Sequence, residues 1–258
     1  MNALERREQI LDLLNIHGRV KVKQLVELLE ISEVTIRGDL RTLEHQGKLQ
    51  RYHGGAQSLE SLPLMTETGT EIRVDRRYKL NPTAKERIAI KAASYIESGS
   101  SVIFDSGSTT YLVAKKVAEI GGIIAITNNL LVADVLSDVE DVTLVMSGGT
   151  YRSKTKSLHG IKAEQCLEGV TADILFIGAD GIDPEKGITT FNTGYVISEV
   201  MAQCARKVIA VADSTKITRV GYNKVLDISI IDILITDDDI DDEYIGAFTQ
   251  KGIEVITV

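Results

Sequence analysis

The residues best suited to chemistry stand in a short loop of acidic, hydroxyl and glycine residues. The loop follows an apolar run, in the segment FDSGSTTYLVAKK over 104–116. Backbone N–H groups at the start of the helix expected here, with the neighbouring hydroxyls, would cradle an anion such as phosphate. The segment is not a P-loop, because no Gly-Lys-Ser/Thr sequence follows. Its candidate ligand-binding residues are Asp105, Ser106, Gly107, Ser108, Thr109 and Thr110.

Two further loops, at 127–129 and 147–157, also follow apolar runs. Loops at the carboxyl ends of strands line the ligand crevice in open α/β sheets. Hydroxyl and N–H donors suit a phosphate and carboxylates suit hydroxyl groups, which predicts a phosphorylated sugar or polyol as ligand. Any one such loop is commonly plain turn chemistry, but three on one sheet edge favour a pocket. The candidates here are Thr127, Asn128, Gly148, Gly149 and Arg152.

A second group of residues lies near the N-terminus, on a segment expected to be helical over 33–45. Ile36, Leu40 and Leu43 are spaced by four and three residues, so they share one face. The other side would present Arg and Thr to the major groove of DNA, where Arg can bridge guanine O6 and N7. The candidate DNA-binding residues of this helix and its cap are Ser32, Val34, Thr35, Arg37, Gly38, Arg41 and His45.

A basic hairpin is expected directly after this helix. Residues 48–58 alternate and turn at Gly54-Gly55, which predicts a two-stranded wing. Its Arg51 and His53 suit phosphates or the minor groove. A solvated basic face or a protein–protein module is the alternative. Helix spacing, cap, outward basic residues and wing together favour a winged helix-turn-helix that binds double-stranded DNA.

The elements that must position these side chains fall into two groups. The N-terminal group is three helices and the wing, with Ser32 capping the third helix. A linker with at most one short helix is expected over 59–81, and Pro82 is placed to open a helix that runs to about Glu97. The three N-terminal helices are expected over 3–15, 22–30 and 33–45.

From Ser101 onward, short β-branched runs alternate with helical segments. This alternation predicts an α/β domain with a largely parallel sheet. The expected strands are 101–105, 123–127, 142–147, 174–180, 208–213, 231–237 and 253–258. The expected helices between them are 110–120, 130–136, 163–170, 195–204 and 242–251.

The composition is that of a folded protein of about two domains, with 258 residues and 43% hydrophobic residues. The net charge is −8, yet residues 1–57 carry nine Lys and Arg against eight Asp and Glu, so the acidic excess lies beyond them. DNA binding would therefore depend on a local basic face. We expect no membrane span, no signal peptide, a cytoplasmic location and no metal or cofactor. Cys166 and Cys204 are expected to be buried, reduced thiols.

The N-terminal segment resembles the DNA-binding domain of the DeoR/GlpR family of bacterial sugar-metabolism repressors. That family typically has VTIRRDL or VTIRKDL, then LE, a glycine and a basic wing ending in GGA. This chain has VTIRGDL at 34–40, with Gly38 in place of the second basic residue. A helix-interior glycine costs about 1 kcal/mol relative to alanine. Gly38 either removes a phosphate contact or allows closer backbone approach to DNA.

The resemblance extends over the C-terminal part through DSGSTT, TN, GG-x-x-R, GADGID and ADSTK. It implies a fold shared with ribose-5-phosphate isomerases and CoA-transferases, a phosphorylated sugar effector and a homodimer or homotetramer. Matching positions add Asp180, Gly181, Asp213 and Lys216 to the candidates, with Asn192 and Glu199 as weaker additions. For Asp180 and Asp213, loop capping and turn formation are the alternatives.

The shared fold raises an enzyme as the alternative function. Isomerases of that type carry DGADE, KGGG and TRE motifs. At the corresponding positions this chain has Ile177 for the first Asp, Thr189 for the Lys and Ser198 for the catalytic Glu, and only Asp180 remains. Proton transfer beside a carbonyl needs a positioned base, and only Glu199, next to Ser198, leaves that possibility open. We therefore expect a repressor with domains at 1–58 and 82–258, released from its operator by a phosphorylated sugar or polyol; the alternative is an isomerase-like enzyme with a vestigial DNA-binding domain.

Overall fold

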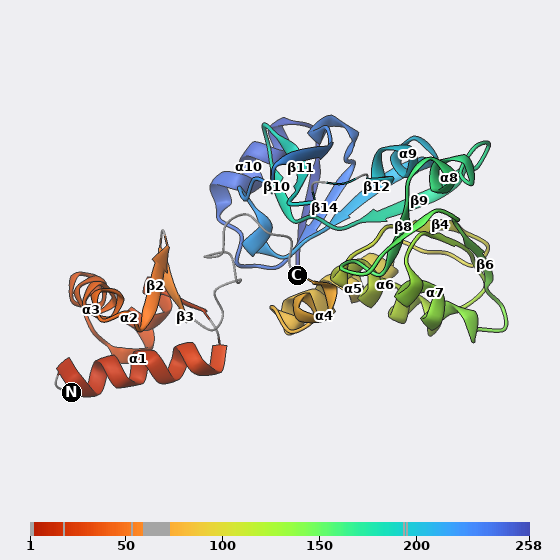
Figure 1. Cartoon of the computed structure of the whole chain (residues 1–258). Helices are drawn as coiled ribbons and strands as arrows, with labels where there is room; N and C mark the ends of the chain where they lie inside the picture. Colours follow the sequence, from red (N-terminus) through yellow and green to blue (C-terminus); the bar gives the residue numbers. More distant parts are fainter. Residues whose placement is uncertain (1–2, 18, 53, 59–72, 193, 195) are drawn as a thin grey trace. The chain divides into compact units, whose positions relative to one another are not determined.

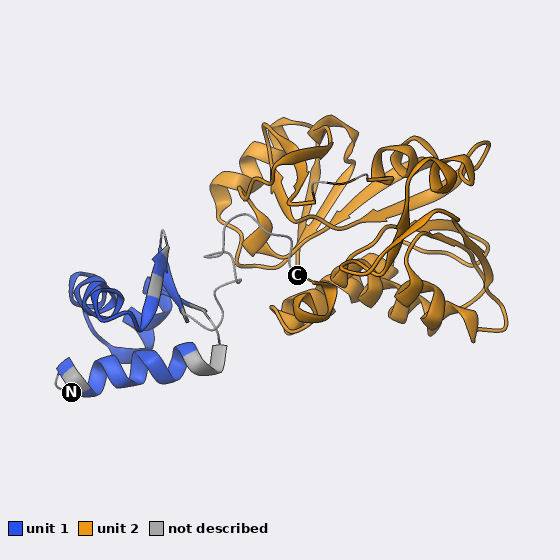
Figure 2. Ribbon diagram, in the orientation of Figure 1, with its two compact units in different colours: residues 1–68 blue, residues 69–258 orange. Residues whose placement is uncertain are grey.

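The chain forms two compact units, residues 1–68 and residues 69–258 (Figure 2). The structure is a computed structural model that describes residues 3–17, 19–52, 54–58, 73–192, 194 and 196–258. The expected linker at 59–81 is wrong in its last part, because residues 73–81 pack within the second unit. Val74 there is buried, and its N–H donates to the Lys154 carbonyl at 2.9 Å.

The first unit is three helices and a small antiparallel sheet around its own core. The expected wing of two strands is wrong by one strand: β1 joins it, pairing with β3 in the order β1-β3-β2. The pairing ties the wing to the chain between the first two helices. The elements are α1 (Ala3–His17), β1 (Arg19–Lys21), α2 (Val22–Leu29), α3 (Glu33–His45), β2 (Leu49–Tyr52) and β3 (Gly55–Ser58).

The core of this unit joins the inward face of α3 to α1 and α2. Ile36, Leu40 and Leu43 are buried there, as their spacing predicts, with Leu25 of α2 and Ile10 of α1 among their neighbours. Burying such side chains stabilises a fold by about 1.5–3 kcal/mol each. Contacts within the unit therefore hold α3 in place.

A buried carboxylate lies on α3 beside the core. Asp39 is 2% exposed and accepts hydrogen bonds from Arg6 Nε at 2.5 Å and from Arg7 Nε at 2.7 Å, both on α1. Burial by itself would raise the pKa of Asp39, but the two guanidinium groups outweigh it and hold that pKa below its usual range. Asp39 therefore fixes α3 on α1 by charge as well as by packing.

The second unit is built on a seven-stranded sheet with strand order β15-β14-β12-β9-β4-β5-β6, and all six pairings are parallel (Figure 1). The predicted strands are thus all present, and the parallel α/β expectation is confirmed. The strands are β4 (Ser101–Phe104), β5 (Ile124–Thr127), β6 (Thr143–Met146), β9 (Ala172–Ile177), β12 (Ala205–Val211), β14 (Ile233–Thr236) and β15 (Glu254–Thr257).

Helices cover both faces of this sheet. Val102 and Phe104 point to the face covered by α5, α6 and α7, while Ile103 points to the opposite face, as a strand period of two requires. Helices expected to end at Glu97 and to fill 163–170 are shorter, and the observed bounds follow. The helices are α4 (Val74–Arg77), α5 (Pro82–Ala93), α6 (Ser108–Ala118), α7 (Leu130–Ser137), α8 (Ile161–Gln165), α9 (Ser198–Gln203) and α10 (Asp242–Gln250), with 3-10 turns η1 (Ser214–Lys216) and η2 (Ile228–Ile230).

Five short strands in the second unit were not predicted. They form a two-stranded hairpin and a three-stranded antiparallel sheet, both beside the carboxyl ends of the central parallel strands. Cys166 is exposed rather than buried. Within the described ranges, no helix is long and apolar enough to cross a bilayer. The five strands are β7 (Thr150–Arg152), β8 (Ser157–His159), β10 (Gly181–Asp183), β11 (Gly187–Thr190) and β13 (Asn223–Leu226).

Candidate functional site

The helix expected to enter DNA is capped and oriented as the sequence predicts. Ser32 is the N-cap of α3, and its Oγ accepts a hydrogen bond from the Thr35 N–H at 3.3 Å. Opposite the buried face, Val34 is 82% exposed, and Arg37, Gly38, Arg41 and His45 are also exposed. This arrangement leaves one side of α3 open along its whole length.

The two arginines of that exposed face differ in their surroundings. Arg37 is paired with Glu33 one turn earlier, at 2.6 Å, so it must exchange this partner for DNA. Arg41 makes no ion pair among the described residues. On the wing, Arg51 is half-buried and lies 3.6 Å from Glu44, while the candidate His53 lies outside the described residues.

Arg41→Ala is expected to weaken operator binding by about 5–150-fold, which corresponds to 1–3 kcal/mol for an arginine that contacts a base. The measurement is a mobility shift at a stated salt concentration, because salt changes every such affinity. Arg206→Ala is the control, since it removes the same charge from an exposed arginine of the second unit. Equal affinities for the two variants would contradict the orientation of α3.

Gly38→Ala is expected to stabilise the DNA-binding unit by about 0.5–1 kcal/mol, because alanine restricts the unfolded chain more than glycine does. A Cβ at this position would have no atom within 4 Å, so the added methyl group meets open space. Thermal unfolding measures the gain. A parallel loss of operator affinity would indicate that the backbone approaches DNA closely here, and unchanged affinity would contradict such an approach.

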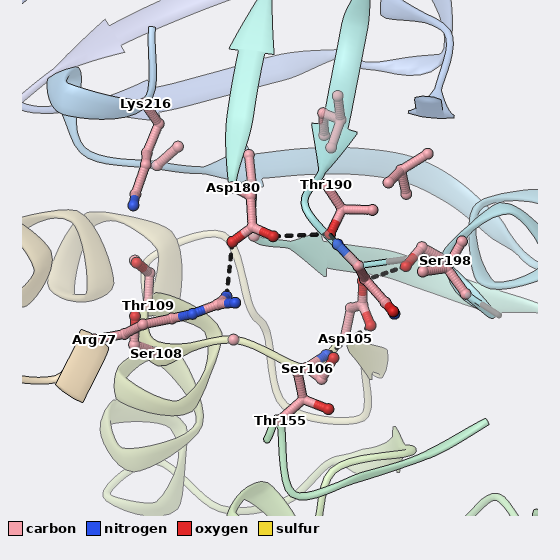
Figure 3. A pocket seen from close by; sticks show the side chains of 18 of the residues that line it. Arg77, Asp105, Ser106, Ser108, Thr109, Thr155, Asp180, Thr190, Ser198 and Lys216 are labelled. Carbon is pink, nitrogen blue, oxygen red and sulfur yellow. Dashed lines mark hydrogen bonds and ion pairs between the residues drawn. The ribbon is translucent and has the colours of Figure 1, made fainter. Parts of the chain in front are cut away.

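The second candidate site is a pocket at the carboxyl ends of β4, β9 and β12 (Figure 3). With its mouth it encloses about 730 Å³. Acidic, basic and hydroxyl side chains dominate its lining, and they come from the loop before α6, the β7–β8 hairpin, β10–β11 and η1. The pocket therefore suits a polar, charged small molecule.

One wall is the start of α6, where the loop after β4 turns into the helix. Gly107 is the N-cap, and the amides of the first helical turn have no partner within the helix. Asp105 is buried beside them and accepts hydrogen bonds from Ser198 Oγ and the Ser106 N–H, each at 2.6 Å. Burial raises the pKa of Asp105, and the two hydrogen bonds oppose that rise only in part.

Facing this wall is Asp180, which follows β9 (Figure 3). Its carboxylate lies 2.9 Å from Arg77 Nη1 and accepts a hydrogen bond from Thr190 Oγ1 at 2.8 Å. Burial would raise its pKa, but Arg77, with Thr190 and Lys216, lowers the pKa below its usual range. Asp180 is therefore an anion that can accept further hydrogen bonds from ligand hydroxyl groups.

A third group of charges surrounds Asp213, which is 1% exposed. The Lys85 ammonium, equally buried, lies 3.4 Å from its Oδ2, and Asn81 Nδ2 donates to its Oδ1 at 2.9 Å. Burial would raise the pKa of Asp213, and the charges of Lys85 and Lys216 hold it well below its usual range. Burial lowers the pKa of Lys216 to about 8, against the attraction of Asp213. The Lys216 ammonium points into the pocket (Figure 3).

The β7–β8 hairpin supplies the remaining cation and a histidine. Arg152 and His159 line the pocket with Thr155, and His159 Nε2 lies 2.7 Å from Ser157 Oγ. Burial and the charge of Arg152 lower the pKa of His159 to about 4, so this ring is neutral near pH 7. Cations therefore line the pocket from α4, α5, η1 and the hairpin, a distribution that suits a phosphate.

The structure brings ten of the seventeen candidate ligand residues together in the pocket lining and places seven outside it. The ten are Asp105, Ser106, Gly107, Ser108, Thr109, Arg152, Asp180, Asn192, Asp213 and Lys216. The seven outside the lining are Thr110, Thr127, Asn128, Gly148, Gly149, Gly181 and Glu199.

Several of these seven residues instead make hydrogen bonds that hold the segments around the pocket together. Thr127 Oγ1 donates to the Phe104 carbonyl at 2.8 Å, which ties two strand ends together. Asn128 Nδ2 donates to the Leu158 carbonyl at 3.1 Å and so holds the hairpin. Thr110 Oγ1 donates to the Gly107 carbonyl, and Glu199 is exposed on α9.

Two of the three glycines, Gly181 and Gly149, allow chain segments to approach closely, and Gly148 contributes its amide. A Cβ at Gly181 would lie 1.9 Å from the Arg219 carbonyl oxygen, and at Gly149 it would lie 2.6 Å from that of His159. The Gly148 N–H donates to Cys166 Sγ. These positions shape the walls rather than line the pocket.

Sequence reasoning missed several residues of the lining, among them Arg77, Lys85, Thr155, His159 and Thr190. Arg77 and Lys85 lie before the first expected strand, in stretches that gave no loop pattern. Their only available signal was that they are basic residues flanking Pro82. The contact that places Arg77 against Asp180 spans more than a hundred residues and depends on the tertiary fold.

Positions that would carry an isomerase's acid–base groups hold other residues. Ile177 is buried at the end of β9, whereas Thr189 and Ser198 line the pocket. Ser198 Oγ is engaged by Asp105, and the neighbouring Glu199 is exposed and outside the lining. Of the corresponding isomerase positions, the lining therefore keeps Asp180 but not the Lys and Glu.

Comparison with known protein families assigns both parts of the chain. Residues 6–62 match the family described as DeoR-like helix-turn-helix domain. Residues 80–238 match the family described as DeoR C terminal sensor domain. Together the two matches span the α3 surface and nearly all of the pocket lining, and they confirm the resemblance drawn from the sequence motifs.

Relatives align over almost the full chain. The chain is 38% identical over 255 residues to a putative aga operon transcriptional repressor of Escherichia coli O157:H7, covering 98% of this chain and 93% of that protein. It is 35% identical to the HTH-type transcriptional regulator GlpR of Haloferax volcanii, covering 99% and 98%. It is 32% identical to the HTH-type transcriptional repressor GlcR of Bacillus subtilis, covering 98% and 95%.

Among solved structures, a ribose 5-phosphate isomerase A from Methanocaldococcus jannaschii aligns with a TM-score of 0.41 and 17% identity, over 54% of this chain and 55% of that one. A likeness at this level carries no argument about fold or function. The assignment rests on the family matches and on the full-length relatives.

Proposed function

Since this chain belongs to the DeoR family of transcriptional regulators, we propose that it represses a carbohydrate operon and leaves its operator when a phosphorylated sugar or polyol binds. The supporting observation is the pocket, where helix-start amides, cations and carboxylates face one another. Amides at a helix start, Lys216 and Arg152 suit a phosphate, while Asp180 and Asn192 suit hydroxyl groups. The proposed site of action is the cytoplasm.

Regulation requires that the ligand favours one arrangement of the protein over another. We infer a homodimer or homotetramer, because two recognition helices must match the spacing of two operator half-sites. The ligand would change that spacing, and it can do so only if it binds one arrangement more tightly. A coupling free energy of about 1–3 kcal/mol suffices for a 5–150-fold change in operator affinity.

The test is a mobility shift with the full-length protein and the DNA upstream of its own gene, at a stated salt concentration. A panel of sugar and polyol phosphates is added, with the unphosphorylated compounds as matched controls. Release by one phosphorylated compound, and not by its unphosphorylated counterpart, is the expected result. Binding of DNA that no phosphorylated compound affects would contradict the proposed effector class.

The same binding reactions also test whether the protein converts a sugar phosphate into another product. We propose that it does not, because Ser198 occupies the position of an isomerase's catalytic Glu and its hydroxyl donates to Asp105. Each sugar phosphate of the panel is recovered and analysed after incubation. Isomerised product, together with no specific DNA binding, would overturn the repressor and favour the enzyme.

A further inference from the structure

The pocket takes one of its cations from α4, which belongs to the second unit but precedes the residues matched by the sensor-domain family. Arg77 is the last residue of α4. It lies between the two family matches, because the helix-turn-helix match ends at residue 62 and the sensor-domain match begins at residue 80. In the chain, α4 follows residues 59–72, which join the two units and lie outside the described residues. Arg77 is thus a pocket residue on the first described element after β3 of the DNA-binding unit.

The position of α4 depends on its contacts with the rest of the second unit. A helix of four residues has no stability of its own, because isolated helices shorter than about 12–15 residues are marginal in water. Val74 is buried and its N–H donates to Lys154 in the β7–β8 hairpin. Tyr78, just after the helix, packs edge-on against Tyr111 of α6 with ring centroids 5.0 Å apart.

Two carboxylates of the pocket hold the other side of this helix. Asp180 binds the Arg77 guanidinium, with 14% and 10% of the two side chains exposed. Lys85, which pairs with Asp213, donates from its ammonium to the carbonyl of Arg77, the last residue of α4, and to that of Leu80 just beyond. A ligand that changes the partners of these carboxylates must therefore change what holds α4.

Arg77 and a bound phosphate would meet in the same space. Figure 3 shows the Arg77 guanidinium directed toward Asp180, in the pocket that Ser108 and Thr109 at the start of α6 also line. A guanidinium binds a phosphate through two parallel hydrogen bonds, and a dianion attracts it more strongly than one carboxylate does. Asp180 would keep the Thr190 hydroxyl and the Phe191 N–H, so it stays hydrogen-bonded after losing Arg77.

We propose that Arg77 is an effector-binding residue that exchanges Asp180 for the effector's phosphate and thereby fastens α4 to the start of α6. The inference rests on the proposed function. It names Arg77 as the residue by which ligand binding in the pocket changes the contacts of α4, the segment that follows the connection to the DNA-binding unit. Asp180, once released, accepts hydrogen bonds from the ligand's hydroxyl groups. The ion pair between Arg77 and Asp180 is thus the arrangement of the ligand-free protein.

The first experiment measures affinity for inorganic phosphate with the full-length protein. Arg77→Gln is expected to weaken phosphate binding about 10-fold, because it removes a charge-assisted pair of hydrogen bonds. Asp180→Asn is expected to strengthen it, because the competitor for Arg77 is gone. Arg76→Gln is the matched control, since it removes the same charge from the exposed neighbour on the same helix. Arg77→Lys keeps the positive charge but lacks the two parallel donors of the guanidinium, so it should retain more affinity for phosphate than Arg77→Gln.

The second experiment follows amide exchange in residues 74–80 with and without phosphate. Wild-type protein and Arg76→Gln are expected to exchange these amides several-fold more slowly when phosphate is bound, and Arg77→Gln is expected to show no such change. Opposite shifts in affinity for the Arg77 and Asp180 variants distinguish a ligand contact from a purely structural pair. An equal fall in phosphate affinity in Arg77→Gln and Asp180→Asn would overturn the inference. So would wild-type amide exchange in residues 74–80 that is the same with and without phosphate.

Failure of this inference and failure of the proposed function give different results. If a sugar phosphate releases wild-type protein and Arg77→Gln from DNA at the same concentration, the role of Arg77 is wrong and the repressor stands. If no sugar phosphate binds to or releases the wild-type protein, the proposed function fails and the inference falls with it.

Discussion

Asp39→Ala is expected to destabilise the DNA-binding unit by about 3 kcal/mol, because it leaves the buried Arg6 without its counter-charge. The free energy of opening the unit is measured by native-state amide exchange in α1 and α3 of the full-length protein. Protection should fall about 100-fold, since each 1.4 kcal/mol is a factor of ten. Sequence-specific DNA binding should fall with it, because Asp39 holds α3 on α1.

The control for this prediction is Asp12→Ala, which removes an exposed carboxylate from the same helix that carries Arg6. Such surface changes are usually within about 0.5 kcal/mol of neutral. Similar protection in the two variants would show that the buried pair contributes nothing.

Acid is expected to have the same effect as the Asp39 substitution. The folded-state pKa of Asp39 is lowered, so its contribution to stability is present above the unfolded-state value of about 3.9 and is lost as pH falls through the lower, folded value. The wild-type unit should therefore lose stability below about pH 4 more steeply than the Asp39→Ala variant. Equal acid dependence in both would contradict the assignment.

Lys216→Gln is expected to reduce affinity for the effector about 10–100-fold, since a hydrogen bond to a charged group contributes about 1.5–3 kcal/mol. Because burial lowers the pKa of Lys216 to about 8, the wild-type protein should also lose affinity as pH rises through about 8. A phosphate monoester is already dianionic there, so its own titration does not produce this loss. Binding isotherms from pH 7 to above pH 9 provide the measurement.

Two further variants make the Lys216 prediction specific. Lys216→Arg keeps the positive charge throughout this range, so its affinity should stay level across pH 8. Lys207→Gln, an exposed lysine on β12, is the matched control and should behave as the wild type. A loss of affinity above pH 8 that persists in Lys216→Arg would assign the titration to another group.

The parallel sheet and α3 could be predicted because the sequence patterns that indicate them are local. The β-branched runs that became β4 and β9 are continuous, and the spacing of Ile36, Leu40 and Leu43 identifies the buried face of α3 without any tertiary information. The additional strands escaped prediction because their short segments contain no continuous apolar run. In β11, for example, Gly187–Thr190 has no alternation to detect.

The pocket was predicted only in part, because a hydroxyl at a strand end has two possible uses. Ser106, two residues after the end of β4, lines the pocket, whereas Thr127, the last residue of β5, donates to the Phe104 carbonyl. Nothing in the sequence distinguishes the two cases. Lys85 faced a different obstacle: its partner Asp213 lies on a strand end far away in the chain, so only the folded protein brings the two together.

The separate core of the first unit has a consequence for engineering and for the exchange of modules during evolution. Among the described residues, its buried apolar core lies between Ile10 and Ala56, so an exchanged N-terminal segment would carry this core whole. The junction of such a chimera belongs before Arg73, because α4 forms part of the sensor. A hybrid joined at Pro82 would carry a complete sheet but would lack Arg77, and we expect a biosensor built that way to respond poorly to its sugar.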